Sequence, residues 1–259
     1  VPEKPAPLVE VQPVQVRDVQ VVVKGFGTVT PKVEVQIVPQ VSGKVVWMNP
    51  NLTAGGFIRA YEEIFRIEPR DYELAVQQAQ ALVADAQVKL DLEKAEAEVA
   101  VREWKQLHPD SEPTSPLVLR EPQIRKAEAA LESARAQLSV AKLSLERTRV
   151  SLPIDVRIVS ESVDLGQYVI AGQPVGQAYG MDAVEIRLPL EDKELAWFDI
   201  PGEPALADGN AGPAERTMAE VTAEFAGAVH TWTGYVARTV GQVDKVSRMV
   251  TVVVEVPNP

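Results

Sequence analysis

The chain reads Ser42-Gly43-Lys44-Val45-Val46-Trp47 at the start of one β-type motif and Asp155-Val156-Arg157-Ile158-Val159 at the start of a second. In each motif an internal glycine is followed by apolar residues three, nine and twelve positions later. These positions are Gly55, Ile58, Ile64 and Ile67 in the first motif and Gly166, Val169, Val175 and Ala178 in the second. Such spacing is typical of short strands separated by glycine turns. Neither half has enough apolar surface for a core of its own, so we predict that the two halves pack together.

The segment between the two halves has a helical pattern. Residues 71–107 contain neither glycine nor proline, and steps of three and four from Val76 to Leu107 meet nine apolar residues in ten positions. A second apolar seam runs from Leu117 to Thr148, and three prolines within residues 109–116 indicate a loop between the seams. Seams with this period indicate a coiled coil. We therefore predict an antiparallel helical hairpin over residues 71–150, with its tip near residues 109–116.

The size pattern of the two seams predicts how the helices pack. If the chain folds about residue 112, a small residue faces a large one in five layers, such as Leu90 with Ala134 and Ala86 with Leu138. This complementarity allows the helices to approach closely. The predicted hairpin core includes Ala86, Leu90, Leu131, Leu138 and Leu145.

The same register gives two charged residues a place beside the seam. Glu93 faces Leu131, and it is expected to reach Arg135 or another basic neighbour, or else to extend into solvent. Trp104 faces Arg120, which favours a cation–π contact near the tip. Packing within the seam explains the tryptophan equally well.

Composition excludes several classes of function. The net charge of -11 argues against nucleic-acid binding, because phosphate recognition needs a basic face. The absence of cysteine excludes disulfides, thiolate metal sites and thiol nucleophiles. No apolar run reaches the roughly 18 residues that a membrane-spanning helix needs. His108 and His230 are far apart and the four methionines are scattered, so we predict no catalytic residue, no metal site and no cofactor.

Several stretches resemble the membrane fusion, or periplasmic adaptor, family of bacterial export systems. The first half of the resemblance comprises Val41–Val45 and the stretch from Gly55 through Ile64-Phe65-Arg66-Ile67 to Tyr72. The second comprises Leu152–Asp155 and the stretch from Val163-Asp164-Leu165-Gly166 to Pro174. Residues 243–248 and 256–259 resemble the end of the family's β-barrel domain. The resemblance covers most of the chain in the right order. It implies a lipoyl-like β-domain that is split by an inserted α-hairpin.

The resemblance therefore implies an elongated, multidomain α+β fold. Residues 33–70 and 151–182 would form the two halves of the lipoyl-like domain, and residues 71–150 would form the coiled-coil hairpin between them. Residues 183–259 would form a β-barrel domain whose C-terminal remainder is missing from this sequence. Residues 1–32 would supply N-terminal strands to the membrane-proximal or barrel region.

The chain departs from the family pattern at two turns and at the hairpin tip. Tyr61 and Val156 stand where the family usually has glycine, so these turns need another geometry or compensation by their neighbours. The tip also lacks the arginine-leucine-serine pattern that adaptors of multidrug pumps present to the outer-membrane channel. The candidate channel-docking residues are Leu107, Ser111, Leu117 and Arg120.

The resemblance implies a non-catalytic periplasmic adaptor. Such a protein couples an inner-membrane transporter, here of the proton-driven resistance–nodulation–division (RND) type, to an outer-membrane channel. Its copies would assemble into a trimeric or hexameric ring, and a segment outside this chain would hold it at the inner membrane. An adaptor of an ABC-type exporter or of a type I secretion system is the alternative.

Two other classes of protein explain less of the sequence. A lipoyl or biotinyl carrier domain needs a modified lysine at the tip of a tight turn between the halves, where this chain has a long helical insert. A cytoskeletal coiled coil leaves the duplicated β-motif unexplained.

Overall fold

The computed structural model describes residues 21–111, 113, 115–200, 217–244 and 247–259. The chain divides into two compact units, one formed by residues 1–30 and 185–257 and the other by residues 31–184 and 258–259. Most of the expected N-terminal strands, within residues 1–20, and the predicted turn at residue 112 lie outside the described residues.

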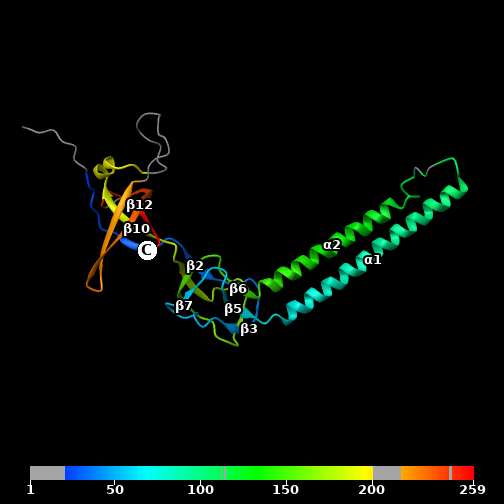
Figure 1. The fold of residues 1–259 in the computed structure, drawn as a ribbon, viewed down its shortest axis with the longest axis horizontal. Helices are drawn as coiled ribbons and strands as arrows, with labels where there is room; N and C mark the ends of the chain where they lie inside the picture. The colour runs from blue at the N-terminus through cyan, green and yellow to red at the C-terminus, as the bar shows by residue number, and fades with distance from the viewer. Residues whose placement is uncertain (1–20, 112, 114, 201–216, 245–246) are drawn as a thin grey trace, which may run out of the picture. The chain divides into compact units, whose positions relative to one another are not determined.

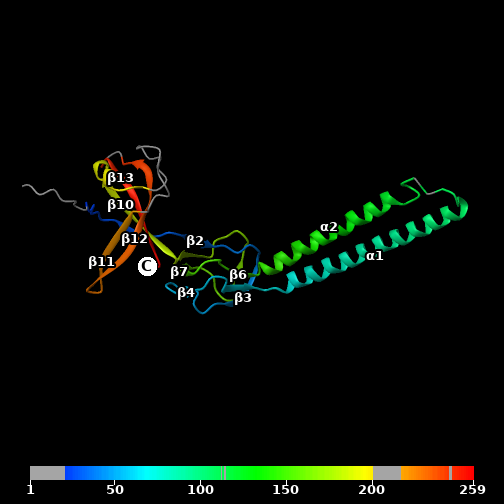
Figure 2. The same ribbon diagram turned by 45° about the horizontal axis from the view of Figure 1, so that its top comes forward.

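The second unit contains two four-stranded sheets, and each sheet takes strands from both halves of the repeated motif (Figure 2). One sheet has the order β2 (Glu34–Ile37), β9 (Gly176–Gly180), β7 (Val156–Glu161) and β4 (Phe57–Ile58). The other has the order β6 (Arg149–Ser151), β5 (Glu63–Ile67), β3 (Gly43–Met48) and β8 (Tyr168–Val169). The two halves therefore pack together, as their spacing predicts.

The repeated apolar positions lie in one shared core. Ile58, Ile64 and Ile67 from the first half and Val169, Val175 and Ala178 from the second are all buried in the same cluster. Phe65 adds its ring to this cluster and is fully buried. Burial of so much apolar surface in a single core is the main source of stability for such a domain.

The two halves also repeat their backbone contacts across the core. The amide of Gly55 donates to the carbonyl of Ile158 at 2.8 Å, and the amide of Gly166 donates to the carbonyl of Val45 at 2.8 Å. Both glycines have a left-handed backbone, with φ of 85° and 89°, which glycine adopts without steric cost. In each half, the glycine turn is therefore hydrogen-bonded to a strand of the other half.

Two long helices interrupt this domain, so the chain as a whole is mixed α and β. Helix α1 spans Arg70–Leu107 and helix α2 spans Glu121–Glu146, and they lie side by side (Figure 1). The second helix begins at Glu121 and not at Leu117, where its seam predicted the start. Pro122 favours the first turn of a helix, and Arg120, just before the helix, has a left-handed backbone.

The helices bury the seam positions, but the predicted register is wrong. Their core contains Ala86, Leu90, Ala127, Leu131 and Ala134. Arg120 lies beside Glu93 and Glu96, whereas folding about residue 112 places it beside Trp104. The reason is that pairing of β5 with β6 fixes the register from the base of the hairpin, where Arg66 pairs with Arg149.

The first unit contains a five-stranded sheet in the order β1-β10-β13-β12-β11. Its strands are β1 (Thr28–Pro31), β10 (Ala183–Glu191), β13 (Met249–Pro257), β12 (Ala228–Val243) and β11 (Met218–Phe225). A 3-10 helix, η1 (Asp192–Trp197), follows β10. Val252, Val253 and Val254 are buried in this unit, and the buried carboxylate of Glu185 binds Arg238 at 2.9 Å. None of the described helices is both long and apolar enough to cross a bilayer.

Candidate functional site

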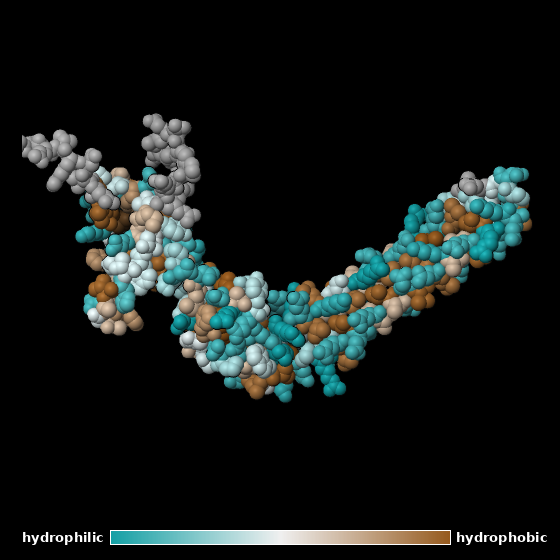
Figure 3. All heavy atoms as spheres, in the orientation of Figure 1, coloured by the Kyte–Doolittle hydropathy of each residue, from teal (hydrophilic) through white to brown (hydrophobic). Residues whose placement is uncertain are grey.

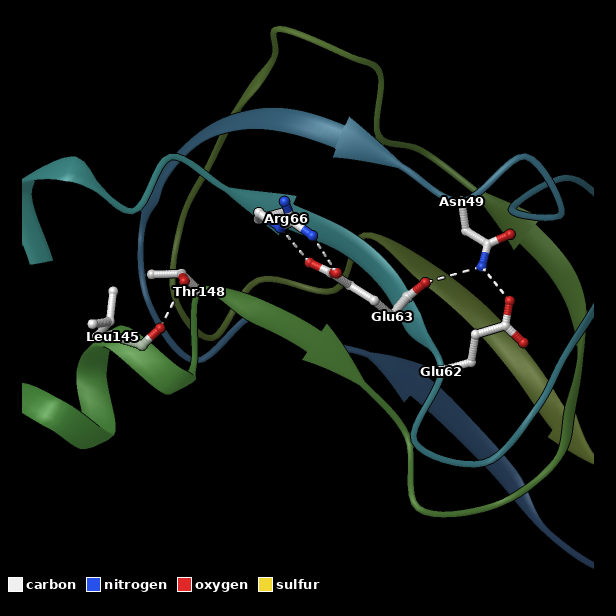
Figure 4. Close-up of polar contacts among 6 residues, drawn as sticks. All are labelled: Asn49, Glu62, Glu63, Arg66, Leu145 and Thr148. Atoms are coloured by element: carbon white, nitrogen blue, oxygen red, sulfur yellow. Dashed lines mark hydrogen bonds and ion pairs between the residues drawn. The ribbon is translucent and has the colours of Figure 1, made fainter. Parts of the chain in front are cut away.

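The hairpin joins the two-sheet domain through adjacent strands. The amide of Ile67, at the end of β5, donates to the carbonyl of Thr148 at 2.8 Å, just after α2. The buried hydroxyl of Thr148 donates to the carbonyl of Leu145 at 2.6 Å (Figure 4). The hydroxyl of Tyr72 in α1 donates to the carbonyl of Ser42 at 2.7 Å. The hairpin therefore leaves and re-enters the domain at one fixed point.

An ion pair between Arg66 and Glu63 lies on strand β5, which leads into α1 at this junction. Arg66 donates from Nε and Nη2 to the two carboxylate oxygens of Glu63, at 2.7 and 2.6 Å. These hydrogen bonds raise the pKa of Arg66. The guanidinium also lies 5.7 Å from the centroid of the Trp47 ring, within cation–π range. These contacts hold the face of β5 that lies beside the hairpin base.

Asn49 holds the turn at the other end of β5, as Figure 4 shows. Its buried side-chain amide donates to the Glu62 carboxylate at 2.9 Å and to the Glu63 carbonyl at 3.0 Å. Its side-chain oxygen accepts from the amide of Asn51 at 2.9 Å. The hydrogen bond from Asn49 lowers the pKa of Glu62. This network has no periodic signal in the sequence, because its partners meet only through the tertiary fold.

At the far end of the hairpin, Arg120 is held against α1. Its Nη2 lies 2.7 Å from Glu93 Oε2 and 2.5 Å from Glu96 Oε2. The hydrogen bond with Glu93 raises the pKa of Arg120. Arg120 is thus the basic neighbour of Glu93, and its ion pairs hold the start of α2 against α1.

The other candidate tip residues lie at the end of α1 and in the loop that follows it. Leu107 and Leu117 are exposed, and the amide of Ser111 donates to the carbonyl of His108 at 3.2 Å. The expected contact between Trp104 and Arg120 is wrong. Trp104 stacks on His108 instead, with ring centroids 4.4 Å apart, because Arg120 is committed to the two glutamates.

The predicted core residues of the hairpin differ in their burial. Ala86, Leu90 and Leu131 are buried between the helices. Leu138 and Leu145 are half-buried. The layer that combines Ala86, Leu90 and Leu131 therefore contributes the most to holding the helices together.

The two positions that lack the expected glycine have different conformations. Val156 lies in strand β7 and is fully buried, so it occupies no turn. Tyr61 keeps a left-handed turn, with φ of 61°. Its counterpart in the second half is Gly172, with φ of 83°, six residues after the internal glycine as Tyr61 is. The amides of both donate to the other half of the domain, to the carbonyls of Leu152 at 2.7 Å and of Pro39 at 2.9 Å, respectively.

This internal comparison predicts that Tyr61→Gly stabilises the protein. The side chain is 78% exposed, so its loss removes little packing, while glycine relieves the left-handed backbone. We expect the free energy of unfolding to rise by about 0.5–1 kcal/mol, measured by urea denaturation. Tyr61→Ala is the control, since it removes the ring and keeps the Cβ atom. An equal gain in the alanine variant would show that the ring, and not the backbone, carries the strain.

The described residues offer no cluster of side chains for metal binding. No group of three or more His, Cys, Asp or Glu side chains in these residues has the geometry to hold a metal ion. His108 stacks on Trp104, and His230 lies 5.8 Å from the ring of Trp232. Both histidines therefore have ordinary aromatic neighbours.

Comparison with known proteins matches this architecture. Residues 33–179 match the family model described as the barrel-sandwich hybrid domain of RND membrane fusion proteins (MFP). The multidrug resistance protein MdtA of Yersinia pestis (strain Pestoides F) is 28% identical over 148 residues, which are 57% of this chain and 32% of that protein. MdtA of Pantoea ananatis (strain AJ13355) is 26% identical over 190 residues, which are 71% of this chain and 45% of that protein. The chain thus spans less than half the length of these curated relatives.

Solved structures share the fold at low sequence identity. MacA from Actinobacillus actinomycetemcomitans aligns with a TM-score of 0.57 and 17% identity, over 91% of this chain and 72% of that one. The membrane fusion protein Spr0693 from Streptococcus pneumoniae R6 aligns with a TM-score of 0.56 and 16% identity, over 89% of this chain and 88% of that one.

Proposed function

We propose that this chain, which belongs to the RND membrane fusion protein family through its barrel-sandwich hybrid domain, is a non-catalytic periplasmic adaptor of an efflux system. In this role it couples an inner-membrane transporter to an outer-membrane channel. The observation that carries the proposal is the two-sheet domain built from both halves of a repeat, with a long helical hairpin inserted between β5 and β6. The relatives named multidrug resistance protein favour drugs as the exported substrates. The family model favours an RND transporter as the partner.

The domain assignment follows from this role. Residues 33–70 and 151–182 form the lipoyl-like domain, and residues 71–150 form the coiled-coil hairpin. Residues 183–259 belong to the β-barrel domain, and residues 1–32 to the membrane-proximal or barrel region. A segment outside this chain holds the protein at the inner membrane, on its periplasmic side.

The mechanism is geometric. A helix of 38 residues is about 57 Å long, so α1 can carry the tip far from the two-sheet domain. The hydrogen bonds of Thr148 and Tyr72 fix the base of the hairpin, so the hairpin keeps its orientation relative to the two-sheet domain. The copies of the chain form a ring, and the ring surrounds the path of the substrate.

The tip supplies the contact with the channel. Leu107 and Leu117 expose apolar side chains, and Ser111 adds a polar group to the tip. Arg120 contributes by shaping the tip, because Glu93 and Glu96 already bind its guanidinium. Exposed apolar side chains at the end of a helical hairpin are suited to packing in an apolar groove of a partner.

Deletion of the gene tests the proposal. We expect the deletion strain to become more susceptible to drugs and detergents, and the intact gene to restore resistance. Leu117→Asp should restore less resistance than the intact gene at equal protein level, because a charge replaces an apolar contact. The matched control is Leu82→Asp, the same change at an exposed leucine of α1 far from the tip. Unchanged susceptibility of the deletion strain to every compound would contradict the role in efflux.

A further inference from the structure

A cavity lies at the base of the hairpin, where the helices meet the two-sheet domain. Its volume of about 500 Å³ is within the range of small-molecule sites. The charged residues that line it come from four elements, namely Arg66 of β5, Arg149 of β6, Glu73 of α1, and Lys142 and Glu146 of α2. Figure 3 shows hydrophilic residues, in teal, gathered where the hairpin joins the domain. A molecule in this cavity therefore meets charged groups of both the sheet and the hairpin.

The sheet side of the cavity has an unbalanced positive charge. Arg66 and Arg149 lie directly opposite each other on adjacent antiparallel strands, and like charges in this arrangement repel each other. Both carboxylate oxygens of Glu63 already bind Arg66, at 2.7 and 2.6 Å. Within the part of the chain that the structure describes, Arg149 forms no ion pair. This side of the cavity favours an anionic group.

The helix side of the cavity carries two carboxylates. Glu146 is the last residue of α2, and the last turn of this helix contains no basic residue. The C-terminus of a helix has a partial negative charge, so a carboxylate is unfavourable there. Lys142 lines the same cavity, but among the described residues neither Glu146 nor Glu73 forms an ion pair with it or with any other residue. This side of the cavity favours a cationic group.

We propose that the cavity binds a small zwitterionic molecule, whose carboxylate pairs with Arg149 and whose ammonium group pairs with Glu146. Such a ligand neutralises both unfavourable charges at once, through charge-assisted hydrogen bonds. Half-buried Leu145 and Pro69 add apolar surface to the lining, which suits a ligand with a hydrophobic body. Dipeptides with an apolar side chain and zwitterionic drugs share this chemistry. The site lies at the end of the hairpin opposite the tip, so it is separate from the channel contact of the proposed function.

The bound ligand connects the domain to the hairpin, because Arg149 belongs to β6 and Glu146 to α2. Two amides mark this junction. The amide of Ile67 donates to the carbonyl of Thr148 at 2.8 Å, and the amide of Thr148 donates to the carbonyl of Leu145 at 3.1 Å. Ligand binding stabilises the closed junction, so hydrogen exchange of both amides should slow when the cavity is filled.

Titration calorimetry of the purified chain with ampicillin and benzylpenicillin tests the charge requirement, because these two compounds differ by one amino group. At about pH 6 this group is charged, and we expect ampicillin to bind about tenfold more tightly. The dipeptide alanyl-phenylalanine and its N-acetyl form give the same comparison for peptides. Binding of ampicillin alone assigns the site to drugs, binding of the dipeptide alone assigns it to peptides, and binding of both assigns it to small zwitterions in general.

Glu146→Gln and Arg149→Gln distinguish the two ends of the ligand. Glu146→Gln should weaken ampicillin binding about tenfold and leave benzylpenicillin binding unchanged, whereas Arg149→Gln should weaken the binding of both compounds about tenfold. Arg147→Gln is the matched control, since Arg147 is exposed and does not line the cavity, and it should bind both compounds as the intact chain does. All three substituted side chains are exposed, so circular dichroism should show unchanged helicity.

Four results would overturn the proposal. They are equal affinity for ampicillin and benzylpenicillin, binding that survives both Glu146→Gln and Arg149→Gln, no detectable binding of any of the four compounds at millimolar concentration, and unchanged exchange of the Ile67 and Thr148 amides in the saturated chain. Calorimetry of the purified chain needs neither a transporter nor a channel. Its failure would therefore leave the efflux role intact, and an unaltered susceptibility of the deletion strain would leave the ligand site intact.

Discussion

Phe65→Ala is expected to lower the free energy of unfolding of the two-sheet domain by about 3–5 kcal/mol, the cost of deleting a buried phenylalanine side chain. Phe65 is fully buried in the core that both halves share. Loss of the ring leaves a cavity that strands of two sheets line, so both halves should loosen together. Urea denaturation followed by circular dichroism below 220 nm and by tryptophan fluorescence measures the loss.

Phe57→Ala is the matched control, since Phe57 is 39% exposed and lies in the same half. It should cost much less. Hydrogen exchange adds a sharper test, because the amide of Val175 in the second half donates to the carbonyl of Ile37 in the first. Faster exchange of this amide in Phe65→Ala is expected. Loss of protection confined to residues 43–67 would show that the halves are independent.

Leu131→Glu is expected to separate the helices of the hairpin. Leu131 lies in the buried layer with Ala86 and Leu90, and the variant removes this packing and places a carboxylate between the helices. We expect a local loss of about 2–5 kcal/mol and a large decrease in helicity at 222 nm. The two-sheet domain should keep its fold, because its core contains no residue of the hairpin seam.

Ala130→Glu introduces the same charge at the neighbouring exposed position and should leave helicity unchanged. Leu138→Glu should have a smaller effect than Leu131→Glu, since Leu138 is half-buried and lies outside the central cluster. An effect of Leu138→Glu as large as that of Leu131→Glu would contradict the observed register.

The sequence predicted which residues face inward. It did not predict which layers of the hairpin face each other, because the pairing of strands distant in the sequence decides this. The offsets from Gly55 and Gly166 located six buried positions, because strand and turn spacing is a local property. The seam likewise located Ala86, Leu90 and Leu131. The facing layers were wrong because the pairing of Arg66 with Arg149, at the base, sets the register. No local pattern encodes that pairing.

The polar contacts were harder to predict for the same reason. Asn49 lies beside a proline in an unremarkable stretch, and its importance comes from its burial beside Glu62 and Glu63. The sequence makes Arg120 a candidate tip residue, but no pattern in it indicates that two glutamates of α1 bind the guanidinium. At Tyr61 the sequence signalled an unusual turn, and only the backbone angle showed that the turn keeps its left-handed form.

The insertion of the hairpin between strands β5 and β6 has a consequence for how the protein is made. Both sheets need strands from either side of the insert, so neither sheet can be completed until the second half is present. The contacts of the two helices build outward from their turn, and their docking brings Ile67 next to Thr148. The conformational entropy of closing a long loop, which grows by about 0.6 kcal/mol for each doubling of its length, is then largely removed before the strands pair. We therefore expect the hairpin to fold early and to accelerate the folding of the domain that carries it.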